Sequence, residues 1–250
     1  MMKILFISLG CDKNLADTEK MLGLLADQGY SFTDDEREAD IIIVNTCCFI
    51  GDAKEESIQT ILEMARYKTE GKCRALLAAG CLAQRYRQEI LEEIPELDGI
   101  LGTTSWDQIG DLVQRALKGE QPRIFQDINR PMTVGGSRVV TTGGHYAYLK
   151  IAEGCDKHCT YCVIPQVRGS YRSVPMEQLL EEARSLAEKG VRELILVAQE
   201  TTVYGKDLYG EKRLPQLLRE LAKIPGIYWI RVQYCYPEEI TDELIQVMKE

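Results

Sequence analysis

The chain has no excess of positive charge and no long apolar run. Its 30 lysines and arginines are outnumbered by 39 aspartates and glutamates, which gives a net charge of -9. No general attraction to nucleic acid is therefore expected, and any RNA contact needs a local basic patch. The short apolar run near the amino terminus is far below the roughly 20 residues that span a membrane, and too short for a secretory core. A lipoprotein cleavage site ending at Cys11 is the alternative interpretation of this run.

Low-complexity tracts and a signal peptide are also missing, while 45% of the residues are hydrophobic and 28% are charged. This is the composition of an ordinary soluble protein. At roughly 100–200 residues per domain, the chain has room for about two domains. Its nine cysteines, without a signal peptide, predict a reducing compartment in which thiols bind metals or take part in catalysis more often than they form disulfides. The expected location is the cytoplasm, with no membrane partner.

Strands and helices alternate in the first half of the chain. Apolar β-branched runs predict strands at 3–8, 41–44, 75–79 and 99–101, and helical spacing of apolar residues predicts helices at 16–27, 53–67, 85–94 and 108–117. Such alternation predicts an α/β domain, a parallel sheet of the flavodoxin-like kind with helices on both faces.

Frequent glycine and proline with little periodicity predict a linker at 119–144, between a first domain at 1–118 and a second at 145–250. The second domain alternates again, with strands expected at 146–152, 193–198 and 228–233 and helices at 175–189, at 214–222 and from 241 onward. A complete (β/α)8 barrel takes ~250 residues, so this half is expected to form part of a barrel. The uncapped helix at the last residue predicts a truncated chain.

Three cysteines lie close together on an expected loop after a strand: Cys155, Cys159 and Cys162, with the spacing C-x3-C-x2-C. Three thiolates this close repel one another and oxidise unless a cation holds them, so the spacing predicts a metal site. A 4Fe-4S cubane held by three cysteines leaves one iron free to bind a substrate or cofactor. Two alternatives remain, a zinc site with His158 as the fourth ligand and a group of buried structural thiols.

The segment 155–162, with Tyr161 directly before the third cysteine, resembles the cluster loop of radical S-adenosylmethionine (radical SAM) enzymes. Its flanks, 146–154 and 163–173, resemble the methylthiotransferases among them, and the resemblance extends over essentially the whole chain. It implies that the second domain is part of a radical SAM (β/α) barrel. It also implies that S-adenosylmethionine binds at the open iron.

The resemblance also indicates cofactor contacts. The triplet 198–200 is similar to the Gly-Gly-Glu element that binds the methionine amine, so Gln199 and Glu200 are expected to bind S-adenosylmethionine. Tyr161 is expected to cover the cluster and to offer its backbone to the adenine. Further candidates for carboxylate or substrate contacts are Arg231, Tyr234 and Arg168. The alternative for each is a polar residue without a ligand.

Three more cysteines, Cys11, Cys47 and Cys81, each follow an expected strand of the first domain. The carboxyl ends of parallel strands share one edge of a sheet, so residues distant in sequence can meet there. We therefore expect a second three-cysteine cluster, which matches the amino-terminal cluster domain of the methylthiotransferases. Taken alone, each residue is better explained as a buried thiol than as a ligand. Cys48 departs from the small residue usual in the family and is a possible alternative ligand, while Cys73 and Cys235 are expected to be structural thiols.

The implied reaction replaces C-H with C-S-CH3, using two 4Fe-4S clusters, S-adenosylmethionine, an electron donor and a sulfur source. Segments 8–14, 151–155 and 234–240 resemble the branch that modifies an aspartate β-carbon of the small-subunit ribosomal protein numbered twelve. Methylthiolation of a tRNA adenosine is the alternative within the family. A non-catalytic iron-sulfur or zinc scaffold is the alternative outside it.

Overall fold

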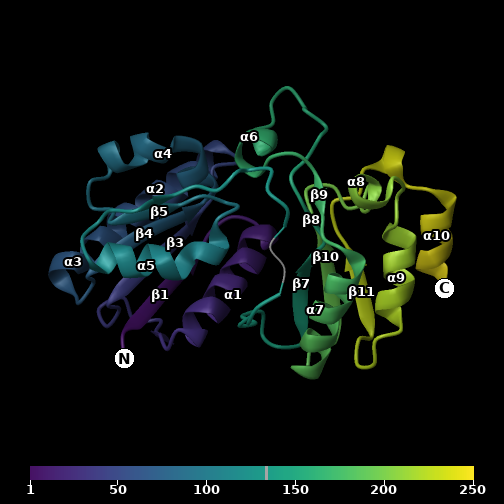
Figure 1. The fold of residues 1–250 in the computed structure, drawn as a ribbon, viewed down its shortest axis with the longest axis horizontal. Coiled ribbons are helices and arrows are strands. Elements are labelled where there is room, and N and C mark those ends of the chain that lie inside the picture. Colours follow the sequence, from purple (N-terminus) through teal and green to yellow (C-terminus); the bar gives the residue numbers. More distant parts are fainter. Residues whose placement is uncertain (133–134) are drawn as a thin grey trace. The chain divides into compact units, whose positions relative to one another are not determined.

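The structure, a computed structural model, describes residues 1–132 and 135–250. The chain packs into two compact units (Figure 1). The first comprises Met1–Arg130, Gly136–Val139 and Tyr161–Arg168, and the second consists mainly of Val140–Thr160 and Gly169–Glu250. The predicted limits of the domains and of the linker stay a prediction.

The first unit is built on a parallel sheet in the order β2-β1-β3-β4-β5-β6. Its strands are β1 (Lys3–Ser8), β2 (Ser31–Phe32), β3 (Ile41–Thr46), β4 (Ala75–Gly80), β5 (Gly99–Leu101) and β6 (Arg123–Ile124). Its helical segments are α1 (Asp12–Asp27), α2 (Gly51–Ala65), α3 (Tyr67–Glu70), α4 (Cys81–Glu93), η1 (Trp106–Gln108), α5 (Ile109–Leu117) and α6 (Ile164–Arg168).

Both faces of this sheet are buried, because helices cover each of them (Figure 1). Strand β3 shows the division, since Ile41 and Ile43 belong to the core under α1 and α5. Its other residues, Ile42 and Val44, belong to the core under α2 and α4. Parallel strands buried on both faces read as continuous apolar runs, which explains why the central strands were predictable.

The second unit contains a parallel sheet in the order β11-β10-β7 and an antiparallel pair, β8 with β9. Its strands are β7 (Tyr146–Lys150), β8 (Ala152–Glu153), β9 (Arg172–Ser173), β10 (Glu193–Val197) and β11 (Trp229–Val232). Its helical segments are α7 (Met176–Glu188), α8 (Lys206–Tyr209), α9 (Leu214–Ala222), η2 (Pro237–Glu239) and α10 (Asp242–Lys249). The expected fold class is confirmed: a parallel-sheet α/β domain followed by part of a β/α barrel.

The structure differs from expectation mainly at the ends of elements. Helix α1 begins at Asp12 instead of residue 16, and α4 begins at Cys81 instead of residue 85. Asp12, Lys13 and Asn14 make the first turn of α1 polar, so apolar periodicity does not reveal it. The first turn of α4 contains the apolar Leu82 and Ala83, which continue the apolar run of β4, so the start of this helix is not marked in the sequence. Strands β2, β6 and β9 were not predicted because two residues are too few to show alternation. In the two described ranges, no helix is both long and apolar enough to cross a membrane.

Candidate functional site

A buried amide network joins the ends of two strands in the first unit. Asn14, on α1, donates from Nδ2 to the carbonyl oxygens of Leu9 at 2.9 Å and of Thr46 at 3.0 Å. Asn45 donates in return to the carbonyl oxygen of Asn14 and to the hydroxyl of Thr18, each at 3.0 Å. Buried amides need such partners, so the network fixes the spacing between the carboxyl ends of β1 and β3.

Cysteines stand at these strand ends. Cys11 is the residue before α1, Cys47 directly follows β3, and Cys81 is the first residue of α4. A Cβ atom on Gly10, which has a φ of +86°, would lie 2.6 Å from Cβ of Cys47 and 2.8 Å from its Sγ. Cys47 therefore packs against the residue that precedes Cys11.

Helix starts are suitable places for a thiolate, because their unpaired N–H groups carry partial positive charge. Burial nevertheless raises the pKa of the Cys81 thiol to about 12, with the Arg168 guanidinium opposing the shift. Burial also raises the pKa of Cys48, against the opposing charge of Arg85. A metal that binds here has to displace thiol protons, so its affinity would depend on pH.

Arg168 lies at the end of α6 and is buried. Its guanidinium donates to Oδ2 of Asp17 at 2.9 Å and, in a short contact, to Oδ1 of Asn14. The hydroxyl of Thr103 donates to the carbonyl oxygen of Val167 at 2.7 Å and holds the same segment. Arg168 was a candidate for carboxylate or substrate contacts; the structure pairs it with Asp17 and places it next to the Cys81 thiol.

No three or more His, Cys, Asp or Glu side chains of the described ranges are grouped as ligands of one metal ion. The zinc alternative, with His158 as the fourth ligand, stays an expectation from the sequence. A 4Fe-4S cubane requires a different arrangement of the cysteine sulfurs. Each cysteine binds a separate iron, so the sulfurs do not converge on one ion. The assignment of both cysteine trios to clusters stays a prediction.

The second unit contains a cavity of about 420 Å³. It is lined by Cys155, Asp156, Lys157, Tyr171, Glu200, Val203, Lys206, Asp207 and Glu239. Small-molecule sites span roughly 300–1,000 Å³, so the volume suits a ligand of nucleoside size. The cluster loop and the residues after β10 thus meet at one concave site.

The cluster loop is fixed at its start. The amide of Cys155 donates to the carbonyl oxygen of Gly169 at 3.1 Å, and Oδ1 of Asp156 accepts the amide of Tyr171 at 3.0 Å. A Cβ atom on Gly154 would lie 2.0 Å from the carbonyl oxygen of Ser170, so only glycine fits before Cys155. Within the loop His158 has a φ of 49°, a left-handed conformation that non-glycine residues rarely adopt.

Glu200 lies in the cavity wall, in the loop that follows β10, and is 1% exposed. Its Oε1 accepts the amide of Thr202 at 3.0 Å and also the hydroxyl of that residue. Its Oε2 is buried and has no hydrogen-bond partner in the described part of the chain. The hydroxyl of Tyr171, in the same wall, is also buried and unpartnered there. An unsatisfied buried carboxylate oxygen calls for a donor, and a ligand ammonium is one.

Gln199 does not line this cavity. Its Nε2 donates to Oε1 of Glu153 at 2.6 Å, and Oε2 of Glu153 binds Nζ of Lys150 at 3.0 Å. Gln199 is thus part of a buried polar group at the strand ends of the second unit. Its expected contact with a cofactor stays a prediction.

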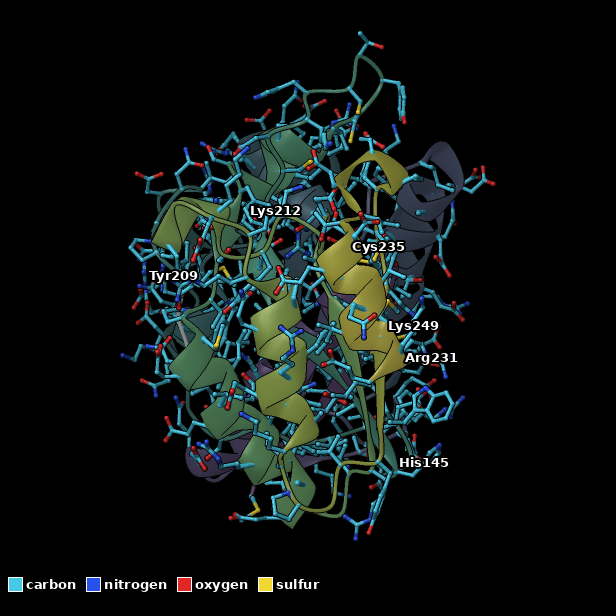
Figure 2. The ribbon with its side chains drawn as sticks, turned by 90° about the vertical axis from the view of Figure 1, so that its right-hand side faces the viewer. His145, Tyr209, Lys212, Arg231, Cys235 and Lys249 are labelled. Carbon is cyan, nitrogen blue, oxygen red and sulfur yellow. The ribbon has the colours of Figure 1, made fainter. Side chains whose placement is uncertain are left out.

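The remaining predicted residues lie outside the cavity wall. Tyr161 is 86% exposed. Arg231, on β11, pairs with Glu193 at 2.7 Å and is seen on the face shown in Figure 2. Cys73 is buried, and this burial raises the pKa of its thiol to about 11. Cys235, labelled in Figure 2, lies 3.4 Å from the hydroxyl of Thr201.

Several cavity residues were not predicted from the sequence. Asp207, on α8, accepts the amide of Ser173 at 2.8 Å and its hydroxyl at 2.6 Å, and so ties α8 to β9. Tyr171 and Lys206 also line the cavity. They come from loops and short elements without periodicity, and only their nearness in sequence to the cluster loop or to Glu200 was available as a signal.

Comparison with family models finds two matches. Residues 3–102 match the Uncharacterized protein family UPF0004, and residues 149–250 match the Radical SAM superfamily. Among curated proteins, a "Ribosomal protein uS12 methylthiotransferase RimO" from Lachnoclostridium phytofermentans is 66% identical over 99% of this chain and 56% of the relative. A protein of the same name from Clostridium perfringens strain 13 is 53% identical over 98% of the chain and 55% of the relative. The chain spans about half the length of these relatives.

Solved structures show the same fold at low identity. The radical S-adenosylmethionine methyltransferase TsrM from Kitasatospora setae, with tryptophan and a SAM analogue bound, matches with a TM-score of 0.63 at 13% identity, covering 99% of this chain and 57% of that one. The cobalamin-dependent radical enzyme OxsB matches with a TM-score of 0.53 at 12% identity, over 100% of this chain and 42% of that one. These likenesses concern the fold alone.

Proposed function

Because the chain belongs to the radical SAM methylthiotransferase family, we propose that it takes part in replacing a C-H bond with C-S-CH3 on the β-carbon of an aspartate in ribosomal protein uS12. The relatives named for this activity are similar to it over nearly its whole length. The observation that carries the proposal is the cavity in which Cys155 and the unpartnered carboxylate oxygen of Glu200 share a wall.

The residues present suit S-adenosylmethionine, whose free ammonium group suits the buried Oε2 of Glu200. The buried hydroxyl of Tyr171, another residue of the same wall, is a second polar group without a partner among the described residues. The thiolates of Cys155, Cys159 and Cys162 would hold the 4Fe-4S cluster that the family implies. When bound, this cluster and S-adenosylmethionine supply a carbon radical that abstracts hydrogen from an unactivated carbon.

In this proposal the residues of the chain hold the cofactor and exclude water. Glu200 orients the methionine end of the cofactor, and the buried polar group of Gln199, Glu153 and Lys150 supports the strand end beside it. The reaction requires the substrate carbon to be held within ~3–3.5 Å of the cofactor carbon that abstracts its hydrogen, and it requires water to be excluded from the site.

For the sulfur-donating half we propose a second 4Fe-4S cluster on Cys11, Cys47 and Cys81. Two of these cysteines stand at helix starts, the third packs against Gly10, and the buried guanidinium of Arg168 offsets thiolate charge. The proposed partners are a sulfur source, an electron donor and a second S-adenosylmethionine for the methyl group. The proposed location is the cytoplasm.

The test uses a protein completed to the length of the relatives, reconstituted with iron and sulfide without oxygen. It is incubated with S-adenosylmethionine and a reductant, together with either ribosomal protein uS12 or tRNA. We expect 5'-deoxyadenosine and, by mass spectrometry, an added SCH3 on uS12 alone. Modification of tRNA alone would contradict the proposed substrate and would indicate the branch that methylthiolates a tRNA adenosine. Metal binding without cleavage of S-adenosylmethionine would support the scaffold instead.

A further inference from the structure

A lysine inside the cluster loop is held by residues that follow β11. Lys157, between Cys155 and Cys159, places its Nζ 3.0 Å from Oε1 of Glu239 and 3.4 Å from Oε1 of Glu238. The same ammonium lies 4.5 Å from the centre of the Tyr236 ring, a cation-π contact. Three groups from one short segment therefore converge on one side chain of the loop.

Glu239 is the centre of this group because its carboxylate forms ion pairs with two lysines, Lys157 and Lys212. Its Oε2 lies 2.7 Å from Nζ of Lys212, which also donates to its carbonyl oxygen at 3.3 Å. Lys212 is labelled on the side of the second unit that faces the viewer in Figure 2. The side chains of Lys157, Glu239 and Lys212 are only 25–31% exposed, so their charges are less screened than those of a free surface pair. The bonds to Lys212 and Lys157 lower the pKa of Glu239 to about 2, so it is ionised at all ordinary pH values.

The segment that carries these groups is itself anchored to the cavity wall. Thr201, next to Glu200, donates its amide to the carbonyl oxygen of Tyr234 at 3.1 Å and its hydroxyl to that of Gln233 at 2.8 Å. Tyr234 has a φ of 63°, so the chain turns sharply there. The anchor thus connects the residue after Glu200 to the segment that reaches Lys157.

We propose that residues 236–239, the clasp, hold the cluster loop against the cavity and thereby set its affinity for S-adenosylmethionine. Lys157 and Glu239 are both cavity-lining residues, so releasing their contact would displace the wall on which Cys155 lies. The clasp belongs to the segment 234–240, which resembles the corresponding segment of the ribosomal-protein branch of the family. No residue of this segment has a role in the reaction proposed above. Glu239 is on this view a positioning residue, and the inference rests on the proposed function.

The first test needs no cofactor. Trypsin cleaves after lysine, and the clasp holds Lys157, so the bond between Lys157 and His158 is expected to be protected in the metal-free chain. In Glu239→Gln, cleavage there should be roughly threefold to tenfold faster, the range expected when a partly buried charged contact is lost. Glu220→Gln, which removes an equal charge on α9 outside the cavity, is the control and should cleave like the wild type. Equal cleavage at this bond in Glu239→Gln and the wild type would overturn the clasp.

The second test measures the dissociation constant of S-adenosylmethionine on the reconstituted chain. We expect Glu239→Gln and Lys157→Gln each to weaken binding roughly threefold to tenfold. The double variant should bind no worse than Lys157→Gln, because the contact between Lys157 and Glu239 is already lost in that single variant. Additive losses would mean that the residues act separately and would refute the clasp. A wild-type chain that assembles its cluster but fails to bind S-adenosylmethionine would instead refute the proposed function, while the trypsin result still decides whether the loop is held.

Discussion

At the scale of single residues, candidate metal ligands could be predicted where they lie close together in the sequence with a characteristic spacing. The spacing of Cys155, Cys159 and Cys162 is local, so it predicts a cluster loop without a structure. Cys11 and Cys81 required the further step of locating strand ends. The two carboxylate partners of Lys157, Glu238 and Glu239, lie 81 and 82 residues away, and nothing in the local sequence indicates these contacts.

Glu200→Gln is predicted to reduce the affinity for S-adenosylmethionine roughly tenfold to a hundredfold, because it removes a charged hydrogen bond to the ligand ammonium. The contacts of Oε1 with Thr202 can persist, so the melting temperature should change little. Equilibrium dialysis with labelled cofactor and a thermal melt measure the two effects. Unchanged affinity would remove Glu200 from the site.

Glu239→Gln is predicted to change the acid stability of the chain. Lysine contacts lower the pKa of Glu239 from 4.5 to about 2, so the stability it contributes is present above 4.5 and is lost as the pH falls toward 2. The melting temperature of the variant should lie below that of the wild type near neutral pH, and the difference should shrink over this acid range. A difference that stays constant with pH would contradict the assigned ion pairs.

At the scale of elements, alternation of apolar runs identified the central strands and their helices, since burial on both faces leaves a strong pattern in β3 and β4. It could not indicate how 136–139 packs. There the amide of Val139 donates to the carbonyl oxygen of Glu19 at 3.1 Å, and Arg138 forms a buried ion pair with Glu19 at 2.6 Å. The glycine-rich stretch predicted as linker is thus docked on α1 at these residues.

Gly23→Ala tests this docking. Alanine in a helix normally stabilises by about 1 kcal/mol relative to glycine. At Gly23 the added Cβ would lie 2.0 Å from the carbonyl oxygen of Ser137, so we expect a destabilisation of roughly 1–3 kcal/mol. Gly51→Ala, at the start of α2 with no atom within 4 Å of the added Cβ, should be neutral or stabilising in the same denaturant titration. Stabilisation at Gly23 would show that 136–139 does not rest on α1.

At the scale of the whole molecule, the order of the two domain types was predictable because each repeats its own strand-helix alternation. The assignment of 161–168 to the first compact unit was not predictable, because these residues continue the cluster loop 155–162, which begins in the second unit. That placement brings Arg168 to Asp17 and Asn14 and to the thiol of Cys81. Long-range packing of a short helix leaves no local signal in the sequence.

The central claim is that two separate cysteine trios each hold a cluster, and the iron and sulfide content of reconstituted variants tests it most directly. The wild type should bind about eight irons and eight sulfides, and the triple variant Cys11→Ser, Cys47→Ser, Cys81→Ser about four of each, with 5'-deoxyadenosine still formed. Cys73→Ala, at a buried thiol outside both trios, should match the wild type. A triple variant that keeps the full iron content, or that loses its cluster and S-adenosylmethionine cleavage together, would contradict the account.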